Sequence, residues 1–181
     1  MKALSDEALM QQIQQGNQTA FQQLVDRYLV TLHAFAQRFL GNANDAEDVV
    51  QEVFLKVWQR AETWQIDKAK LSTWLYQITH NNCIDWQRKS KLKTVELAAA
   101  EEIGMLDNDD LQQAETKQQV EQALQKLPER QKSALVLCYY QGMSYRDAAD
   151  ILQIKVAALE SLLARGRRSL KKQLAANMAE D

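Results

Sequence analysis

Residues 44–58 read NDAEDVVQEVFLKVW, a pattern typical of an amphipathic helix. Val49 and Val53 lie four residues apart, so a helix places them on one side with the other apolar residues of the stretch. Asn44 with Glu47 three residues later is the pattern of a capped helix start. We therefore expect an apolar inner face and an outer face of acidic and amide side chains.

The same helical periodicity continues on both sides of this stretch. Before it, apolar residues at intervals of three and four predict a helix that begins near Asn17. This helix should end at Gly41, because glycine suits the left-handed conformation of a helix C-cap. After it, a looser segment at 63–71 leads into a helix that finishes in the basic run RKSKLK at 88–93. With 5 Gly and 1 Pro in 181 residues, long helices are expected and the fold class is all-α.

Residues 144–172 have the layout of a helix-turn-helix. Ser144 is a capping residue for a short helix, 153–155 is the turn, and a longer helix follows. The small Ala148 and Ala149 would let the two helices cross closely. The second helix can enter the major groove of DNA, although an ordinary hairpin with a solvated basic face is the alternative. Its candidate DNA contacts are Glu160, Ser161, Ala164, Arg165 and Arg168.

The net charge of −2 is divided unevenly along the chain. Residues 1–93 carry +1, residues 94–119 carry −6 and residues 120–181 carry +3. Because the acidic middle also lacks an apolar stripe, we predict two small helical domains, 1–93 and 116–181, joined by an acidic linker at 94–115. On such a tether we expect the two domains to pack only weakly unless a partner holds them together.

A second candidate nucleic-acid surface lies near the end of the N-terminal domain. Arg88, Lys89 and Lys91 can hold a phosphate backbone. The amide of Asn81 can pair with a base edge, and the ring of Trp64 can stack on an unpaired base. The alternative without DNA is that the basic run is only a solvated face, Asn81 only a surface amide and Trp64 only a core ring.

The outer face of the helix at 45–58 is a third candidate surface. Its acidic and amide side chains, above all Asp48, Gln51 and Glu52, can dock a basic helical partner. A plain amphipathic helix with a solvated outer face explains the same pattern.

Other function classes find no support in the sequence. No Ser/His/Asp set, paired catalytic carboxylates, phosphate loop or metal-ligand spacing is visible, so we expect no enzyme, no metal and no other cofactor. Cys83 and Cys138 fit reduced, buried thiols, and His80 with Cys83 is too small a set for a metal site. No apolar run can span a membrane and no signal peptide is visible, so we expect a cytoplasmic protein.

Three stretches, in order, resemble the extracytoplasmic-function group of bacterial sigma-70 factors. The resemblance covers about residues 5–93 and 116–173, with a linker where larger sigma factors have a full region 3. The segment DAEDVVQEVFLKVW at 45–58 is similar to region 2.2. The segment at 73–86, with TWLYQITHNN and DW, is similar to regions 2.3–2.4. Region 4 is matched by LPERQ at 127–131, GMSY at 142–145 and ARGR at 164–167.

The resemblance implies a protein that binds core RNA polymerase and directs promoter recognition, melting and initiation without covalent chemistry of its own. The 45–58 helix would bind the clamp of the beta-prime subunit, and the C-terminal domain would meet the beta flap. Asn81 and the loop at 63–72 would capture a flipped base of the non-template strand at the −10 element, with the run at 88–93 on the backbone. The second helix of the helix-turn-helix would read the −35 element. Such proteins are commonly held inactive by an anti-sigma factor.

The helix-turn-helix departs from the family pattern at four positions. Gln153 and Lys155 stand where Gly and a Ser cap are frequent, and Glu160 and Leu162 stand where basic residues are frequent. A carboxylate on the reading face repels phosphate but can accept a hydrogen bond from cytosine N4.

A stand-alone helix-turn-helix regulator that does not join polymerase is the alternative function. It explains residues 144–172 but leaves the 45–58 helix and the aromatic-rich segment at 63–86 without a role. A protein-binding adaptor would have no need of basic surfaces on two separate domains.

Overall fold

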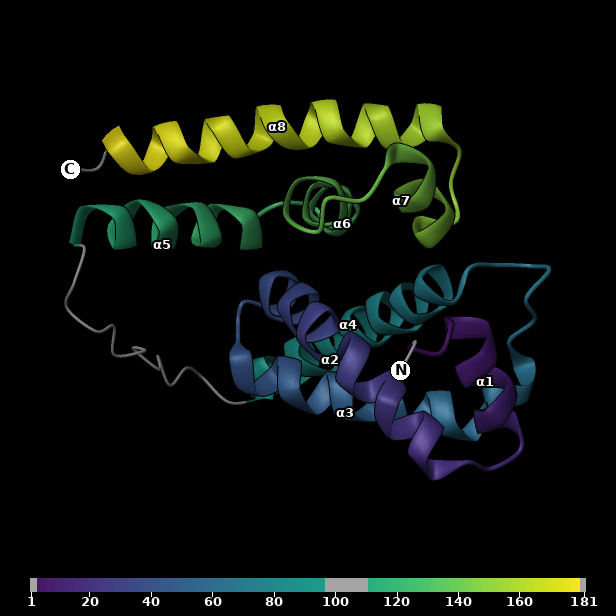
Figure 1. Ribbon diagram of the computed structural model, residues 1–181. Helices are drawn as coiled ribbons and strands as arrows, with labels where there is room; N and C mark the ends of the chain where they lie inside the picture. The colour runs from purple at the N-terminus through teal and green to yellow at the C-terminus, as the bar shows by residue number, and fades with distance from the viewer. Residues whose placement is uncertain (1–2, 97–110, 180–181) are drawn as a thin grey trace.

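The computed structural model describes residues 3–96 and 111–179, and over these ranges it consists of helices and their connections (Figure 1). The predicted all-α class with two helical domains is confirmed. The N-terminal domain contains α1 (Asp6–Gln14), α2 (Gln18–Leu40), α3 (Ala43–Gln59), the 3-10 turn η1 (Ala61–Thr63) and α4 (Leu71–Glu96). The C-terminal domain contains α5 (Leu111–Gln125), α6 (Glu129–Leu135), the π-helical turn η2 (Val136–Tyr140), α7 (Tyr145–Leu152) and α8 (Val156–Ala179).

The start of α3 differs from the predicted one by two residues. Gly41 ends α2 in the left-handed conformation, with φ 74°, as its sequence position predicts. The cap of α3 is Asn42 rather than Asn44, because the Asn42 side chain accepts the backbone N–H groups of Asn44 and Asp45 at 2.9 and 3.1 Å. Two asparagines close together offer two possible caps, and the one that directly follows the helix-ending glycine is used.

The helices on either side of the predicted linker are longer than expected. Helix α4 runs to Glu96 and α5 begins at Leu111, so both enter the range 94–115. Thr94, Val95 and Glu96 include neither glycine nor proline, and nothing in them stops a helix that is already formed. The rest of the predicted linker, 97–110, lies outside the described residues.

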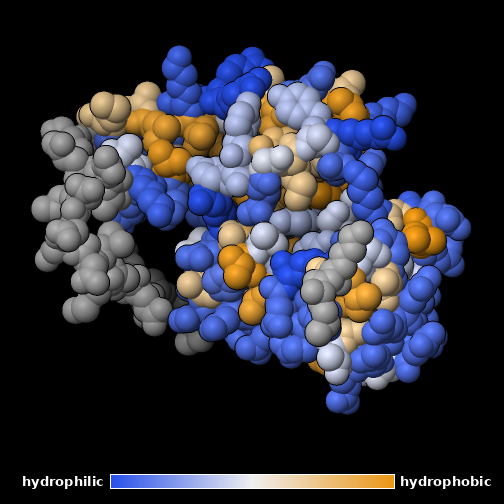
Figure 2. Space-filling view, viewed as in Figure 1, coloured by the Kyte–Doolittle hydropathy of each residue, from blue (hydrophilic) through white to orange (hydrophobic). Residues whose placement is uncertain are grey.

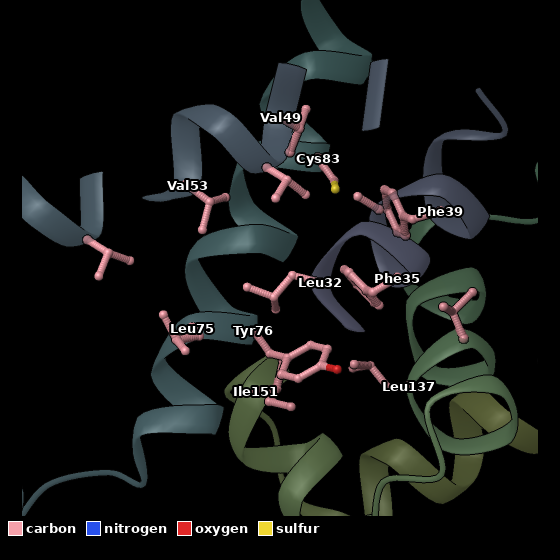
Figure 3. Packing of buried hydrophobic residues seen from close by; sticks show 14 of the residues in the cluster. Leu32, Phe35, Phe39, Val49, Val53, Leu75, Tyr76, Cys83, Leu137 and Ile151 are labelled. Atoms are coloured by element: carbon pink, nitrogen blue, oxygen red, sulfur yellow. The ribbon is translucent and has the colours of Figure 1, made fainter. Parts of the chain in front are cut away.

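The core of the N-terminal domain forms where α2, α3 and α4 meet. Phe35 and Phe39 from α2 are fully buried, as are Val49 and Val53 from α3 and Leu75 from α4 (Figure 3). Fully burying a side chain of this kind contributes about 1.5–3 kcal/mol. This packing leaves the opposite, polar face of α3 in solvent.

The C-terminal domain is held together by a close crossing of α6 and α8. A Cβ on Gly166 would come within 3.0 Å of Leu135, so the glycine allows this approach. Ala148 and Ala149 of α7 are buried, as their small size predicts for crossing helices. Long α8 runs alongside the other C-terminal helices in Figure 1.

The expectation that the two domains pack weakly is wrong. Buried residues of both domains form one continuous hydrophobic cluster. In the space-filling view of Figure 2, the surfaces of the two domains touch across the centre of the molecule. In Figure 3, Tyr76 of α4 lies beside Ile151 of α7 and Leu137 of η2. The sequence pattern could not predict this, because each of these side chains also fits the core of its own domain.

Candidate polymerase and nucleic-acid interfaces

The outer face of α3 is free, as predicted. Asp48, Gln51 and Glu52 are exposed, opposite the buried valines of the same helix. The Glu52 carboxylate pairs with the Lys56 ammonium at 2.8 Å, and the same ammonium donates to the Asn82 side-chain oxygen of α4 at 2.5 Å. The acidic face is therefore tied to the helix that carries Asn81.

An apolar groove lies between α2 and α3 beside this acidic face. It has a volume of about 760 Å³. Leu29 and Leu55 are 42% and 55% exposed on its walls, and Glu47 and Gln51 add polar groups. Sequence reasoning missed this groove, although Leu55 stands among the polar residues of α3 and could have indicated it. The combination of an apolar floor and acidic side chains suits an amphipathic basic helix.

The candidates for single-stranded DNA divide between surface and core. Arg88, Lys89 and Lys91 are exposed along the C-terminal half of α4, and Asn81 is exposed one to two turns before them. Trp64 is only 6% exposed and belongs to the hydrophobic core. In this conformation its ring packs inside the protein instead of facing a base.

The backbone around Trp64 is fixed from the other side by α1. The Gln14 side chain donates to the carbonyl oxygens of Ala61 and Trp64 at 2.9 and 3.3 Å. The connection between α3 and α4, which contains Trp64, is thus anchored at its start by α1.

Asn81 opens onto a cavity between the two domains. The cavity has a volume of about 170 Å³ and is lined by residues of α4, α6, α7 and α8. Beside Asn81 the walls include Ile84 of α4, Ser133 of α6 and Leu162 of α8. No local pattern in the sequence indicates that the −10 candidate Asn81 and the helix-turn-helix line one cavity.

The helix-turn-helix forms as predicted. The Ser144 hydroxyl accepts the N–H of Asp147 at 3.0 Å and caps α7. The turn after α7 places Gln153 in the left-handed conformation with φ 56°, and it is the one non-glycine residue with positive φ among those described. This conformation is the physical reason why glycine suits the position.

The predicted reading face lies on one side of α8. Glu160, Ser161, Arg165 and Arg168 are exposed there and Ala164 is half-buried among them. Arg167 points away from this group, because its guanidinium bonds to the Tyr139 hydroxyl. The exposed arginines provide the charge that phosphate contacts require, and the acidic Glu160 lies between them and the helix start.

Metal and membrane sites are not supported by the described part of the chain. It contains no group of three or more His, Cys, Asp or Glu side chains arranged to hold a metal ion. Within the same residues, no helix combines the length and apolar character that crossing a bilayer requires.

Two family models match the chain in the order of its domains. Sigma-70 region 2 matches residues 24–92, and Sigma-70 region 4 matches residues 117–170. Together they cover the helices that carry all three candidate surfaces.

Curated relatives match over nearly the whole length. The chain is 33% identical to the ECF RNA polymerase sigma factor SigW of Bacillus subtilis, covering 91% of this chain and 94% of the relative. It is 32% identical to SigM of Mycobacterium tuberculosis over 94% of this chain and 85% of the relative. It is 30% identical to the sigma-E factor of Escherichia coli, over 92% of this chain and 93% of the relative.

Two solved structures resemble both domains together. One is CnrH in complex with the cytosolic domain of CnrY, with a TM-score of 0.69, 29% identity and coverage of 94% of this chain and 97% of that chain. The other is the sigma factor RpoE with the anti-sigma factor NepR from Bartonella quintana, with a TM-score of 0.65, 27% identity and coverage of 86% and 96%.

Proposed function

Because this chain belongs to the extracytoplasmic-function family of RNA polymerase sigma factors, we propose that it joins core RNA polymerase and directs the complex to a specific set of promoters. The single observation that carries this function is the pair of sigma regions, matched in order on two helical domains. A stand-alone regulator is not favoured, because it would leave the N-terminal match without a purpose. Acting with polymerase places the protein in the cytoplasm.

The N-terminal domain, which we assign to residues 1–93, supplies the polymerase contact. Asp48, Gln51 and Glu52 dock a basic helix of the beta-prime clamp, and the adjacent groove between α2 and α3 receives its apolar side chains. Both parts of this surface are exposed in the structure, which supports the assignment.

The same domain captures the −10 element. Asn81 takes a flipped base, and Arg88, Lys89 and Lys91 hold the backbone of the non-template strand. Trp64 acts here by packing, since its ring is buried.

The C-terminal domain, which we assign to residues 116–181, reads the −35 element. The reading face is the exposed side of α8, with Ser161 and Arg165 at its centre and Arg168 on the phosphates. The beta flap contacts this domain. An anti-sigma factor regulates the protein, because a structural relative was solved in complex with one.

In-vitro transcription with purified core polymerase and a genomic-fragment library tests this function. Discrete start sites that require the protein are expected, and their alignment gives the −10 and −35 sequences. Asn81→Ala and Arg165→Ala should each lower transcription from these promoters about 10- to 100-fold, since a good base contact is worth about 1–3 kcal/mol. Lys126→Ala, an exposed change in the turn that follows α5, is the matched control and should have no effect. No new start sites and no binding to core polymerase would refute the function.

A further inference from the structure

We propose that Glu160 is a specificity-determining residue of the −35 contact and that its carboxylate selects a cytosine in the major groove. This inference rests on the proposed function and deepens it, because it assigns a base to one position of the reading face. The place of Glu160 on α8, its neighbours and the chemistry of the four bases support it.

Glu160 lies in the half of α8 that reaches base edges. Helix α8 begins at Val156, which makes Glu160 its fifth residue, and the side chain is exposed. In helix-turn-helix proteins the N-terminal residues of the second helix contact the bases. Arg168, the proposed phosphate contact, lies about two turns later, or roughly 12 Å further along the helix axis. The carboxylate is therefore placed for a base and not for the backbone.

Nothing among the described residues neutralises this carboxylate. Side chains three and four residues apart are neighbours on a helix, and for Glu160 these are Val156, Ala157, Leu163 and Ala164. Within the described parts of the chain, none of the ion pairs involves Glu160. Its position also lies beyond the first turn, where a carboxylate would stabilise the start of a helix. The charge thus has neither a partner nor a stabilising role within its own helix.

The surface around Glu160 contains no cation and is partly apolar. Residues 156–164 include no Lys or Arg, and the positive charge of α8 begins at Arg165. Ala157 is exposed beside Glu160, and Ala164 is half-buried on the same face. Apolar groups of this size suit thymine methyl groups. Because no cation beside it can hold a phosphate, this end of the reading face would only repel DNA unless a base donates to the carboxylate.

Of the four bases, cytosine suits an unpaired carboxylate best. In the major groove it presents only its N4 amino donor, so a carboxylate oxygen can accept from it without facing an acceptor. Guanine presents the N7 and O6 acceptors and thymine the O4 acceptor, and these groups repel a negative charge. Adenine presents its N6 donor beside the N7 acceptor. The expected order of preference at this base is therefore cytosine, then adenine, then guanine and thymine.

The test uses the full chain, core polymerase and a promoter found with the genomic-fragment library, with its −35 element randomised. Sequencing of the transcripts gives the base preference at each position for the wild type, Glu160→Gln and Glu160→Ala. Glutamine can pair with the N6 and N7 groups of adenine, and alanine removes the polar contact. Glu121→Gln, the same change at an exposed position of α5, is the matched control. Circular dichroism verifies that helix content is unchanged.

The wild type should prefer cytosine over guanine or thymine about tenfold at one −35 position, as is usual for one mismatched base pair. Glu160→Gln should move this preference toward adenine, and Glu160→Ala should accept the four bases nearly equally. All other positions should keep their preferred bases in both variants. Glu121→Gln should match the wild type throughout the element.

Three results would overturn the inference. The first is a wild-type −35 element without a preferred cytosine, and the second is a cytosine preference that persists in both Glu160 variants. The third is transcription that changes equally for all sequences, which would show that the carboxylate only repels the phosphate backbone. Each of these leaves the proposed function intact while the wild type starts transcription with core polymerase. Failure of the wild type to start transcription would remove both.

Discussion

The two outward faces of the N-terminal domain differ in what covers them. The outer face of α3, with Asp48 and Glu52, is exposed beside an open groove. The α4 face that carries Gln77 and His80 is bound by the C-terminal domain, whereas the neighbouring Asn81 stays exposed. Both α3 and α4 carry polar residues on their outward faces, so from composition alone the two faces would be equally accessible to a partner. The difference shows that packing between the domains, and not the composition of each helix, decides which face is free.

The largest expected effect tests the open face. Asp48→Lys reverses the charge at the centre of the proposed polymerase contact and should weaken binding of core polymerase about 100-fold, the effect of a strong interface residue. The fold should not change, since the side chain is exposed. Glu62→Lys, an exposed acidic residue on η1, is the control. Equal binding of core polymerase by both variants would place the contact elsewhere.

The covered face should respond to pH through His80. Burial lowers the pKa of this imidazole to about 4 from an ordinary 6.5, so between these values the unfolded chain holds a proton that the folded chain lacks. The stabilisation is therefore complete above pH 6.5 and decreases as the pH falls toward 4. Going from pH 7.5 to 5.5 should remove about 1.4 kcal/mol of the free energy of unfolding.

Urea unfolding at the two pH values measures this effect. His80→Gln keeps a hydrogen-bonding group opposite Ser133 but does not titrate. Between the two pH values, the free energy of unfolding of this variant should therefore change by about 1.4 kcal/mol less than that of the wild type. His33 is present in both proteins and does not affect the difference. The same pH dependence in the wild type and the variant would show that His80 is not buried against the C-terminal domain.

A smaller gain should come from the turn of the helix-turn-helix. Gln153→Gly relieves the left-handed backbone at φ 56° and should raise the free energy of unfolding by about 1 kcal/mol. Gln15→Gly, at another helix end but with φ −89°, should bring no gain. If thermal unfolding shows the same change for both, the turn is not strained as described.

The smallest effect is expected at the exposed ion pair between the domains. Lys70→Glu and Asp147→Lys should each lower stability by about 0.2–1 kcal/mol at low salt, and the double variant should restore it. A double-mutant cycle by chemical denaturation gives the coupling. A coupling well above this range would mean that the ion pair, and not the buried polar pairs, keeps the domains together.

The sequence predicted the helices and most candidate contacts because their signals are local. Ser144 caps α7 whatever else the chain does, and exposed Arg165 follows from its place opposite buried Leu163 on one helix. Trp64 could not be placed in this way, because an aromatic ring fits either a base or a core. Its burial depends on packing against residues that are distant in the sequence, such as those of α1.

By itself, the sequence determined the all-α class, the two sigma regions and the residues that face outward on each helix, since periodicity, caps and charge act within one or two turns. Only the tertiary structure decided which of these faces is free. That choice depends on pairs such as His80 with Ser133 and Gln77 with Asp150, which lie 53 and 73 residues apart. No local pattern encodes such pairs, because each partner is an ordinary helical residue until the other domain packs against it.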